Sequence, residues 1–221
     1  MNLIFRDRKD SGLRLAQALK DLKGKNPIIL AIPRGGVPVA KEIADFLDCE
    51  MDLIITRKVG APGNPEFAIG SVTQDGELIT DREFATSYGV GESYLLEESK
   101  RQAKLIKERL KKFRGDKPYP SLENRIVVIV DDGIATGYTI RAAVQSIKRK
   151  NPALLIIAVP VAPRETIEQL QSEVDRVVCL STPEIFYAIG EFYENFEQVE
   201  DEEVVKILKA SDSARRQAQA I

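Results

Sequence analysis

The sequence predicts an α/β fold, in which an open parallel sheet carries helices on both faces and an inserted hairpin and helix form a hood or lid. Unbroken apolar runs rich in β-branched residues are typical of strands covered on both faces, as in parallel sheets. The runs are residues 27–32, 126–130 and 154–161. Amphipathic segments separate them, and this alternation indicates parallel strands joined by right-handed crossovers. With 221 residues, 43% of them hydrophobic, the chain suffices for one domain with a substantial core.

The composition excludes several classes of function. The net charge is −2, so no overall field attracts nucleic acid or an anionic membrane, and we expect neither as a partner. No apolar run approaches the ~20 residues of a membrane-spanning helix. The N-terminus has no apolar leader, and we expect a cytoplasmic location. The absence of histidine excludes Ser-His-Asp and Cys-His catalysis and a His-ligated zinc. Cys49 and Cys179 are far apart and are interpreted as packing residues.

A glycine-containing turn follows the first strand and precedes a predicted helix over residues 37–47. Its residues are Pro33, Arg34, Gly35 and Gly36. The glycine pair allows a tight turn that presents backbone N–H groups, with Arg34 beside them. This arrangement suits an anion, although Gly-Gly is also common in ordinary strand-to-helix turns. Before this strand, residues 11–22 predict a short amphipathic helix with a structural role.

The next strand, predicted over residues 51–57, ends in two cations, Arg57 and Lys58. If these cations lie at the same sheet edge as the turn of residues 33–36, they would neutralise a polyphosphate. The alternative is that they are only the solvated end of a strand. Residues 59–66 are dense in glycine and proline, which predicts a mobile loop over the site. Asn64 and Glu66 are the candidate lid residues of this loop.

Residues 59–122 break the alternation and form an insertion within a single domain of residues 1–221. An Asp-Gly step predicts an antiparallel hairpin of residues 67–72 and 77–80. A long helix is predicted over residues 93–113, with an apolar stripe formed by Leu96, Ser99, Ala103, Ile106, Leu110 and Phe113. Lysines from Lys100 to Lys111 line another face. Glutamates interrupt this row, which favours a solvated face over a nucleic-acid surface.

Two carboxylates and a turn of mostly small residues follow the strand of residues 126–130. Asp131 and Asp132 lie at its carboxyl end, the edge at which ligands bind in open α/β sheets. The next helix starts with Ala135, Thr136, Gly137, Tyr138 and Thr139. Their backbone N–H groups, two threonine hydroxyls and the helix dipole predict a phosphate site.

The last predicted elements are a strand, a helix, a strand and a terminal helix, over residues 154–161, 164–174, 177–180 and 201–209. Five aromatic residues cluster between residues 181 and 196. Either they pack a loop onto the core, or Phe186 or Tyr187 forms a wall against which a planar ring stacks. Three acidic residues suit the start of the terminal helix, and the polar remainder of the chain is expected to fray.

The run from Val130 to Thr139, an apolar strand end followed by an acidic pair and Thr-Gly-x-Thr, resembles the phosphoribosyl pyrophosphate (PRPP) motif of the type I phosphoribosyltransferases. Residues 32–36, Ile-Pro-Arg-Gly-Gly, resemble the pyrophosphate loop of that family. Residues 57–66 and 192–196 resemble segments of a bacterial subgroup with no assigned acceptor. The resemblance implies a Rossmann-like fold and the Mg²⁺- and PRPP-dependent transfer of a 5-phosphoribosyl group to a nitrogenous small-molecule acceptor. It also implies release of pyrophosphate and a tendency to form homodimers.

The resemblance also implies roles for individual residues. Asp131 and Asp132 would hold the ribose hydroxyls beside an oxocarbenium-like centre. The 5′-phosphate would lie against residues 135–139. The pyrophosphate would be bound by Arg34, Gly35 and Gly36, with help from Arg57 and Lys58. Mg²⁺ would be held mainly through PRPP, with the two aspartates as candidate protein ligands.

Two departures from the family pattern leave the acceptor open. Ala135 stands where oxopurine-type members carry an acid, and the bulky Tyr138 occupies a position that often holds a small residue. Two other functions also remain open. One is a regulatory module that binds PRPP or a nucleotide without transfer, and the other is a hydrolase of phosphoribosyl compounds.

Overall fold

The computed structural model of the protein describes residues 4–219, apart from the side chains of residues 65, 66 and 214–219. Its main sheet has parallel strands in the order β2-β1-β6-β7-β8. These strands are β1 (Ile28–Ala31), β2 (Glu50–Leu53), β6 (Ile126–Val130), β7 (Leu154–Val161) and β8 (Arg176–Ser181). The predicted parallel sheet is confirmed, and β1 lies beside β6.

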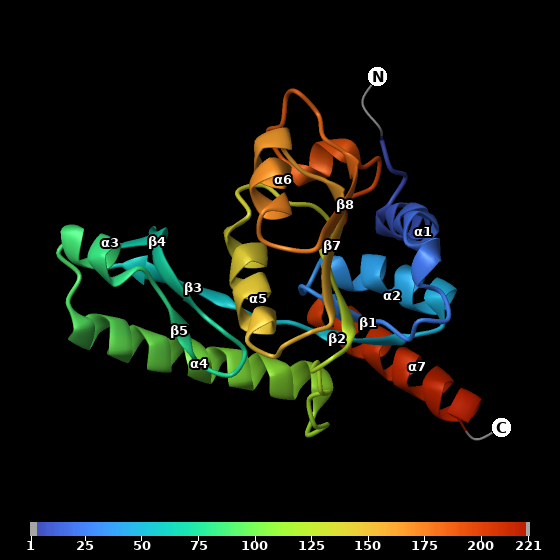
Figure 1. The fold of residues 1–221 in the computed structure, drawn as a ribbon, viewed down its shortest axis with the longest axis horizontal. Helices are drawn as coiled ribbons and strands as arrows, with labels where there is room; N and C mark the ends of the chain where they lie inside the picture. Colours follow the sequence, from blue (N-terminus) through green and yellow to red (C-terminus); the bar gives the residue numbers. More distant parts are fainter. Residues whose placement is uncertain (1–3, 220–221) are drawn as a thin grey trace.

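Helices cover both faces of this sheet, as predicted (Figure 1). One face carries α1 (Arg8–Ala18), α2 (Gly36–Leu47) and α7 (Asp201–Gln219), and the other carries α5 (Tyr138–Lys148) and α6 (Arg164–Gln171). Successive side chains of a strand point to opposite faces. Ile29 and Val128 therefore pack under α1 and α2, whereas Leu30 and Ile129 pack under α5 and α6. Within residues 4–219, no helix combines the length and the apolar character needed to cross a membrane.

Between β2 and β6 the chain builds an arm, residues 57–114, that projects from the core (Figure 1). The arm consists of the antiparallel strands β3 (Arg57–Ala61), β4 (Asn64–Val72) and β5 (Leu78–Ile79) and the helices α3 (Arg82–Ser87) and α4 (Glu92–Arg114). The predicted hairpin is confirmed, because β4 pairs with β5 and Val72 lies opposite Leu78. The predicted long helix is confirmed as α4.

Two predictions for the start of the arm are wrong. The strand expected over residues 51–57 stops at Leu53, and Arg57 begins β3. The loop expected over residues 59–66 is a hairpin, in which Val59 pairs with Gly70. The mainly apolar run of residues 51–55 predicts one long strand, but its last residues form a buried bend between the two strands. Asn64 begins β4 and is exposed. The side chain of Glu66 lies outside the described part, so the lid role of both residues stays a prediction.

The helices differ from the prediction in smaller ways. Leu95, which is 1% exposed, faces the core instead of Leu96, which is 49% exposed. Two adjacent leucines are equivalent in periodicity, so only the packing of the arm selects one of them. The short helix α3 was not predicted, and α6 ends at Gln171. Helix α7 continues to Gln219, beyond the predicted end at residue 209.

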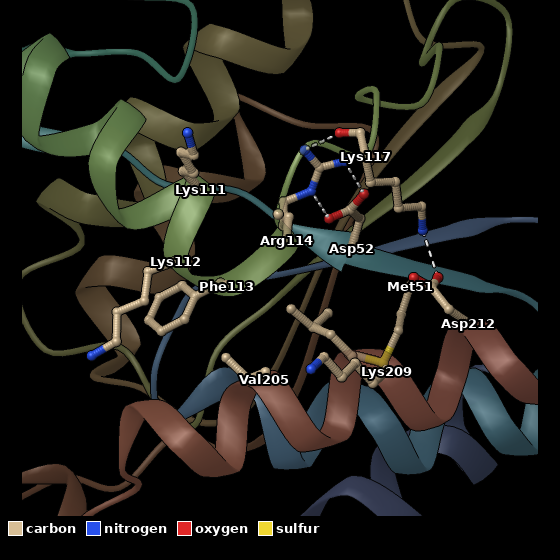
Figure 2. A pocket seen from close by; sticks show the side chains of 12 residues that line it. Met51, Asp52, Lys111, Lys112, Phe113, Arg114, Lys117, Val205, Lys209 and Asp212 are labelled. Carbon is tan, nitrogen blue, oxygen red and sulfur yellow. Dashed lines mark hydrogen bonds and ion pairs between the residues drawn. The ribbon is translucent and has the colours of Figure 1, made fainter.

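A buried ion pair anchors the end of α4 to the main sheet (Figure 2). Arg114 donates from Nε and Nη2 to the two carboxylate oxygens of Asp52, at 2.6 and 2.8 Å. Both side chains are almost fully buried, at 7% and 1% exposure. They lie at a cavity of about 230 Å³ between α4, β2 and α7, where Lys117 also pairs with Asp212. These contacts fix the arm against the core.

Candidate active site

The candidate site lies where the strand order of the main sheet reverses. The chain crosses from β1 to β2 in one direction and from β6 to β7 in the other, through helices on opposite faces. Ligands of open α/β sheets bind at such a point, beyond the carboxyl ends of the strands. Ala31 of β1 lies opposite Val130 of β6, so the glycine turn and the acidic pair begin at the same level. The structure therefore brings these two predicted turns together.

The glycine turn packs directly onto the acidic pair. A Cβ atom on Gly35 would lie 1.9 Å from Oδ2 of Asp132, and one on Gly36 would lie 2.7 Å from the carbonyl oxygen of Val130. Gly35 has a φ of −60°, which any residue adopts. The lack of space beside the acidic pair, rather than a special backbone conformation, therefore explains the glycines. The peptide bond between Pro33 and Arg34 is cis.

The two carboxylates of the acidic pair have different surroundings. Asp131 accepts a hydrogen bond from the amide of Asp132 at 2.9 Å. Burial, together with the neighbouring charge of Asp132, raises the pKa of Asp131 well above its ordinary value. Asp132 accepts a hydrogen bond at Oδ2 from Nε of Arg8 at 2.8 Å. Its carbonyl oxygen accepts one from the hydroxyl of Tyr193 at 2.7 Å. Asp132 is thus held by side chains from both ends of the chain.

The predicted phosphate turn opens α5. Gly137 has a φ of +78°, a conformation that other residues adopt only with strain, and α5 begins at the next residue. The hydroxyls of Thr56 and Thr166 donate to the carbonyl groups of Thr139 and Ala135, at 3.3 and 3.2 Å. The side chains of Ala135, Thr136, Tyr138 and Thr139 are exposed. The start of α5 therefore faces solvent, where its N–H groups can meet an anion.

A cavity of about 890 Å³ separates the arm from the start of α5. Arg57 and Lys58 of β3 line it together with Thr136, Tyr138 and Thr139. Nε of Arg57 donates to Oε1 of Gln102 at 2.5 Å, which holds this cation against α4. The structure thus brings the two predicted cations to the phosphate turn, although they belong to the arm. Asp131, Asp132 and the glycine turn are not among the residues that line this cavity.

Arg34 is engaged by the start of α7. Its Nη1 donates to Oε2 of Glu200 at 3.3 Å and lies 3.8 Å from Oδ1 of Asp201. Two cations of α4, Arg109 and Lys112, also lie beside the Asp201 carboxylate, at 3.7 and 2.7 Å. The hydrogen bond from Lys112 holds the pKa of Asp201 below its ordinary value. Asp201 therefore links the glycine turn to the arm.

The aromatic loop packs mainly onto the core. Phe192 and Tyr193 are 3% and 6% exposed, and Phe186 stacks on Phe192 with ring centroids 5.4 Å apart. Tyr187 is 81% exposed. A ring-binding role for Phe186 or Tyr187 stays a prediction. The sequence does not indicate Tyr193 as a partner of Asp132, because it is one aromatic residue among five in this loop.

Arg8 is the other residue at the candidate site that the sequence does not indicate. It is 124 positions from Asp132 along the chain and belongs to no motif. The only local signal was a charged N-terminal segment, which is usually a solvated surface.

The carboxylates fit a magnesium ion that arrives with a phosphorylated ligand. Among the described residues, no group of three or more His, Cys, Asp or Glu side chains is arranged to hold a metal ion. Mg²⁺ commonly combines one or two carboxylates with phosphate oxygens and water. Asp131 and Asp132 provide such a donor set at the carboxyl end of β6.

Comparison with known families agrees with this geometry. A model described as "Phosphoribosyl transferase domain" matches residues 13–197, which include the glycine turn, the acidic pair and the phosphate turn. The chain belongs to the phosphoribosyl transferase family. Its parallel central sheet, with helices on both faces, is that of the type I phosphoribosyltransferases, as the sequence predicted.

Similar proteins occur in Mycobacterium tuberculosis. The protein named "Putative phosphoribosyl transferase Rv0571c" from Mycobacterium tuberculosis strain H37Rv is 38% identical over 218 residues. The alignment covers 99% of this chain and 49% of that protein. A second protein, from M. tuberculosis strain CDC 1551, has the same identity and coverage. The chain thus spans about half the length of these relatives.

Solved structures show the same fold. The protein TT1426 from Thermus thermophilus is 42% identical and superposes with a TM-score of 0.83, over 93% of this chain and 98% of that chain. The AQ2163 protein from Aquifex aeolicus is 15% identical with a TM-score of 0.50, over 83% of this chain and 78% of that chain. The second likeness shows the fold alone.

Proposed function

We propose that the protein transfers a 5-phosphoribosyl group from Mg²⁺-bound PRPP to a nitrogenous acceptor and releases pyrophosphate. The contact between Gly35 and Asp132 carries the proposal, because it joins the turn for the leaving group to the carboxylates for the sugar. The phosphate turn follows the same strand as these carboxylates. A ligand at this edge of the sheet would meet groups suited to each part of PRPP.

The proposed complex assigns each part of PRPP to one group of residues. The ribose hydroxyls lie at Asp131 and Asp132, and the 5′-phosphate lies at residues 135–139. The pyrophosphate lies at residues 34–36, with Arg57 and Lys58 approaching from the arm. Bound Mg²⁺ would lower the charge on the leaving pyrophosphate, with Asp131 and Asp132 as its candidate protein ligands.

Catalysis in this proposal depends on position and charge. The acceptor nitrogen bonds to the anomeric carbon while the carbon–oxygen bond to pyrophosphate breaks. The electron pair of the broken bond leaves with pyrophosphate. The acceptor nitrogen releases its proton to water. Carboxylates beside the anomeric carbon favour its positive charge in the transition state. Holding the reactants in place supplies much of the remaining effect, which suits a chain without histidine.

The test is a pyrophosphate-release screen with Mg²⁺, PRPP and a panel of purines, pyrimidines and other ring acceptors. We expect release with at least one acceptor, and its loss in the double variant Asp131→Asn/Asp132→Asn. The matched control is Asp116→Asn, which removes an exposed carboxylate from a turn outside the site. Unchanged PRPP affinity in the double variant, measured by calorimetry, would overturn the proposal.

The same screen separates the two alternative functions. A regulatory module would bind PRPP but release no pyrophosphate with any acceptor. A hydrolase would accumulate ribose 5-phosphate from PRPP and Mg²⁺ alone. Reactions without acceptor therefore belong in every series.

A further inference from the structure

We propose that Arg8 is a positioning residue of the donor site, which holds the Asp132 carboxylate in place and joins α1 to it. The inference rests on the proposed function, because it adds a residue to that same site. Arg8 precedes residues 13–197, the part of the chain that matches the family. It is therefore a contribution of the N-terminal segment of this chain to the site.

The guanidinium group of Arg8 is held by three contacts. Nε donates to Oδ2 of Asp132 at 2.8 Å, and Nη1 donates to the carbonyl oxygen of Glu197 at 2.6 Å. The central carbon of the group lies 3.9 Å from the ring centroid of Phe196. The side chains of Arg8 and Asp132 are only 12% and 11% exposed. A short, charged hydrogen bond in such surroundings is stronger than a surface ion pair.

The neighbours of Arg8 form one unit around Asp132. The amide of Phe5 donates to the carbonyl of Phe192 at 2.8 Å, and the amide of Glu194 donates to the carbonyl of Phe5 at 2.8 Å. The hydroxyl of Tyr193 lies within hydrogen-bonding distance of Ser11 Oγ, at 3.3 Å, and donates to the carbonyl of Asp132. Helix α1 and residues 192–197 therefore meet at Asp132, and Arg8 contacts both Asp132, through an ion pair, and residues 196–197.

The position of Arg8 has a consequence for the donor site. Two adjacent carboxylates repel each other, and one that is buried without a partner is costly. Arg8 compensates the charge of Asp132 and binds Oδ2, so the orientation of the carboxylate is set before a ligand arrives. Asp132 can then accept a ribose hydroxyl at Oδ1 without reorganisation, which lowers the cost of binding.

The test compares the affinity of Mg²⁺-bound PRPP by calorimetry in wild type, Arg8→Met, Arg8→Lys, Asp132→Asn and the Arg8→Met/Asp132→Asn double variant. We expect Arg8→Met to weaken binding by about tenfold or more, the size of effect for one lost charged hydrogen bond. Arg8→Lys keeps the charge and should recover part of the loss. In the Asp132→Asn background, Arg8→Met should cause no further loss.

Arg14→Met is the matched control. Arg14 lies on the same helix, pairs with Asp10 at 2.7 Å and lies over the ring of Phe5, but its ion pair is local, four residues along the helix, and does not involve the acidic pair. We expect wild-type affinity in this variant.

Equal or tighter PRPP binding in Arg8→Met, or the same loss in the Asp132→Asn background, would overturn the Arg8 proposal alone. If wild type binds no PRPP, the proposed function fails, and the Arg8 proposal fails with it. If Arg8→Met does not fold, the PRPP affinity of Arg8→Lys is the deciding measurement. Wild-type PRPP affinity in Arg8→Lys would then overturn the proposal.

Discussion

Gly36 lies against the backbone of Asp131, so that a Cβ atom on Gly36 would lie 2.9 Å from Cα of Asp131. The glycine turn and the acidic pair are therefore packed backbone to backbone. Because a backbone neighbour cannot rotate away as a side chain can, any substitution at Gly36 must push the two strand ends apart.

We expect Gly36→Ala to destabilise the protein by about 1–3 kcal/mol, the usual cost of overpacking. It should also weaken PRPP binding, because it displaces both turns. Urea unfolding and calorimetry measure the two effects. The control is Gly91→Ala, where the added Cβ atom would lie 3.9 Å from Ser93 Oγ, an ordinary contact, and only the helix cap changes. Equal PRPP affinity in Gly36→Ala and wild type would contradict the packing argument.

The buried pair of Arg114 and Asp52 should be important for stability. Arg114→Met leaves the Asp52 carboxylate buried without its charged partner, which typically costs about 3–5 kcal/mol. Arg82→Met is the comparison, because Arg82 and Glu92 form an exposed pair at 74% and 51% exposure. It should cost less than about 1 kcal/mol. Similar urea midpoints for the two variants would show that the buried pair does not anchor the arm.

The raised pKa of Asp131 predicts how stability depends on pH. A carboxyl group with a raised pKa binds its proton more tightly in the folded protein than in the unfolded chain. Its contribution to stability therefore falls as pH rises from the ordinary value of 3.8 through the raised pKa of the folded state. Asp131→Asn cannot ionise and should lose this part of the pH dependence. Urea unfolding of both proteins between pH 4 and pH 8 tests this, and parallel stability curves would contradict it.

The ion pair between Arg34 and Glu200 should compete with pyrophosphate. Glu200 is 59% exposed, so the pair is weak and easily exchanged. We expect Glu200→Gln to tighten binding of inorganic pyrophosphate by up to about fivefold at low salt, with a smaller effect at high salt. Glu202→Gln is the control, because Glu202 lies in the first turn of α7, two residues after Glu200, but is not among the ion-pair partners of Arg34. Weaker pyrophosphate binding in Glu200→Gln would mean that Glu200 orients Arg34.

Local patterns were enough to predict the main sheet and the two turns of the site. Buried parallel strands need continuous apolar runs, and residues 126–130 show one in sequence alone. Asp131 follows that run directly, so its place at the sheet edge needed no tertiary information. The glycine pair at residues 35–36 was equally visible, although its physical reason, the contact with the acidic pair, was not.

Long-range packing decided the remaining features of the site. Arg57 begins a strand of the arm and lines the cavity at the phosphate turn from outside the main sheet. The sequence does not show this, because the bend before Arg57 is as buried and apolar as a strand. Leu95 rather than Leu96 faces the core because the docking of α4, not its periodicity, selects one of two equivalent leucines. Arg8 meets Asp132 across 124 positions of sequence. Such a contact depends on how α1 packs on the sheet. The local sequence around a charged helical residue does not predict a partner that is distant along the chain.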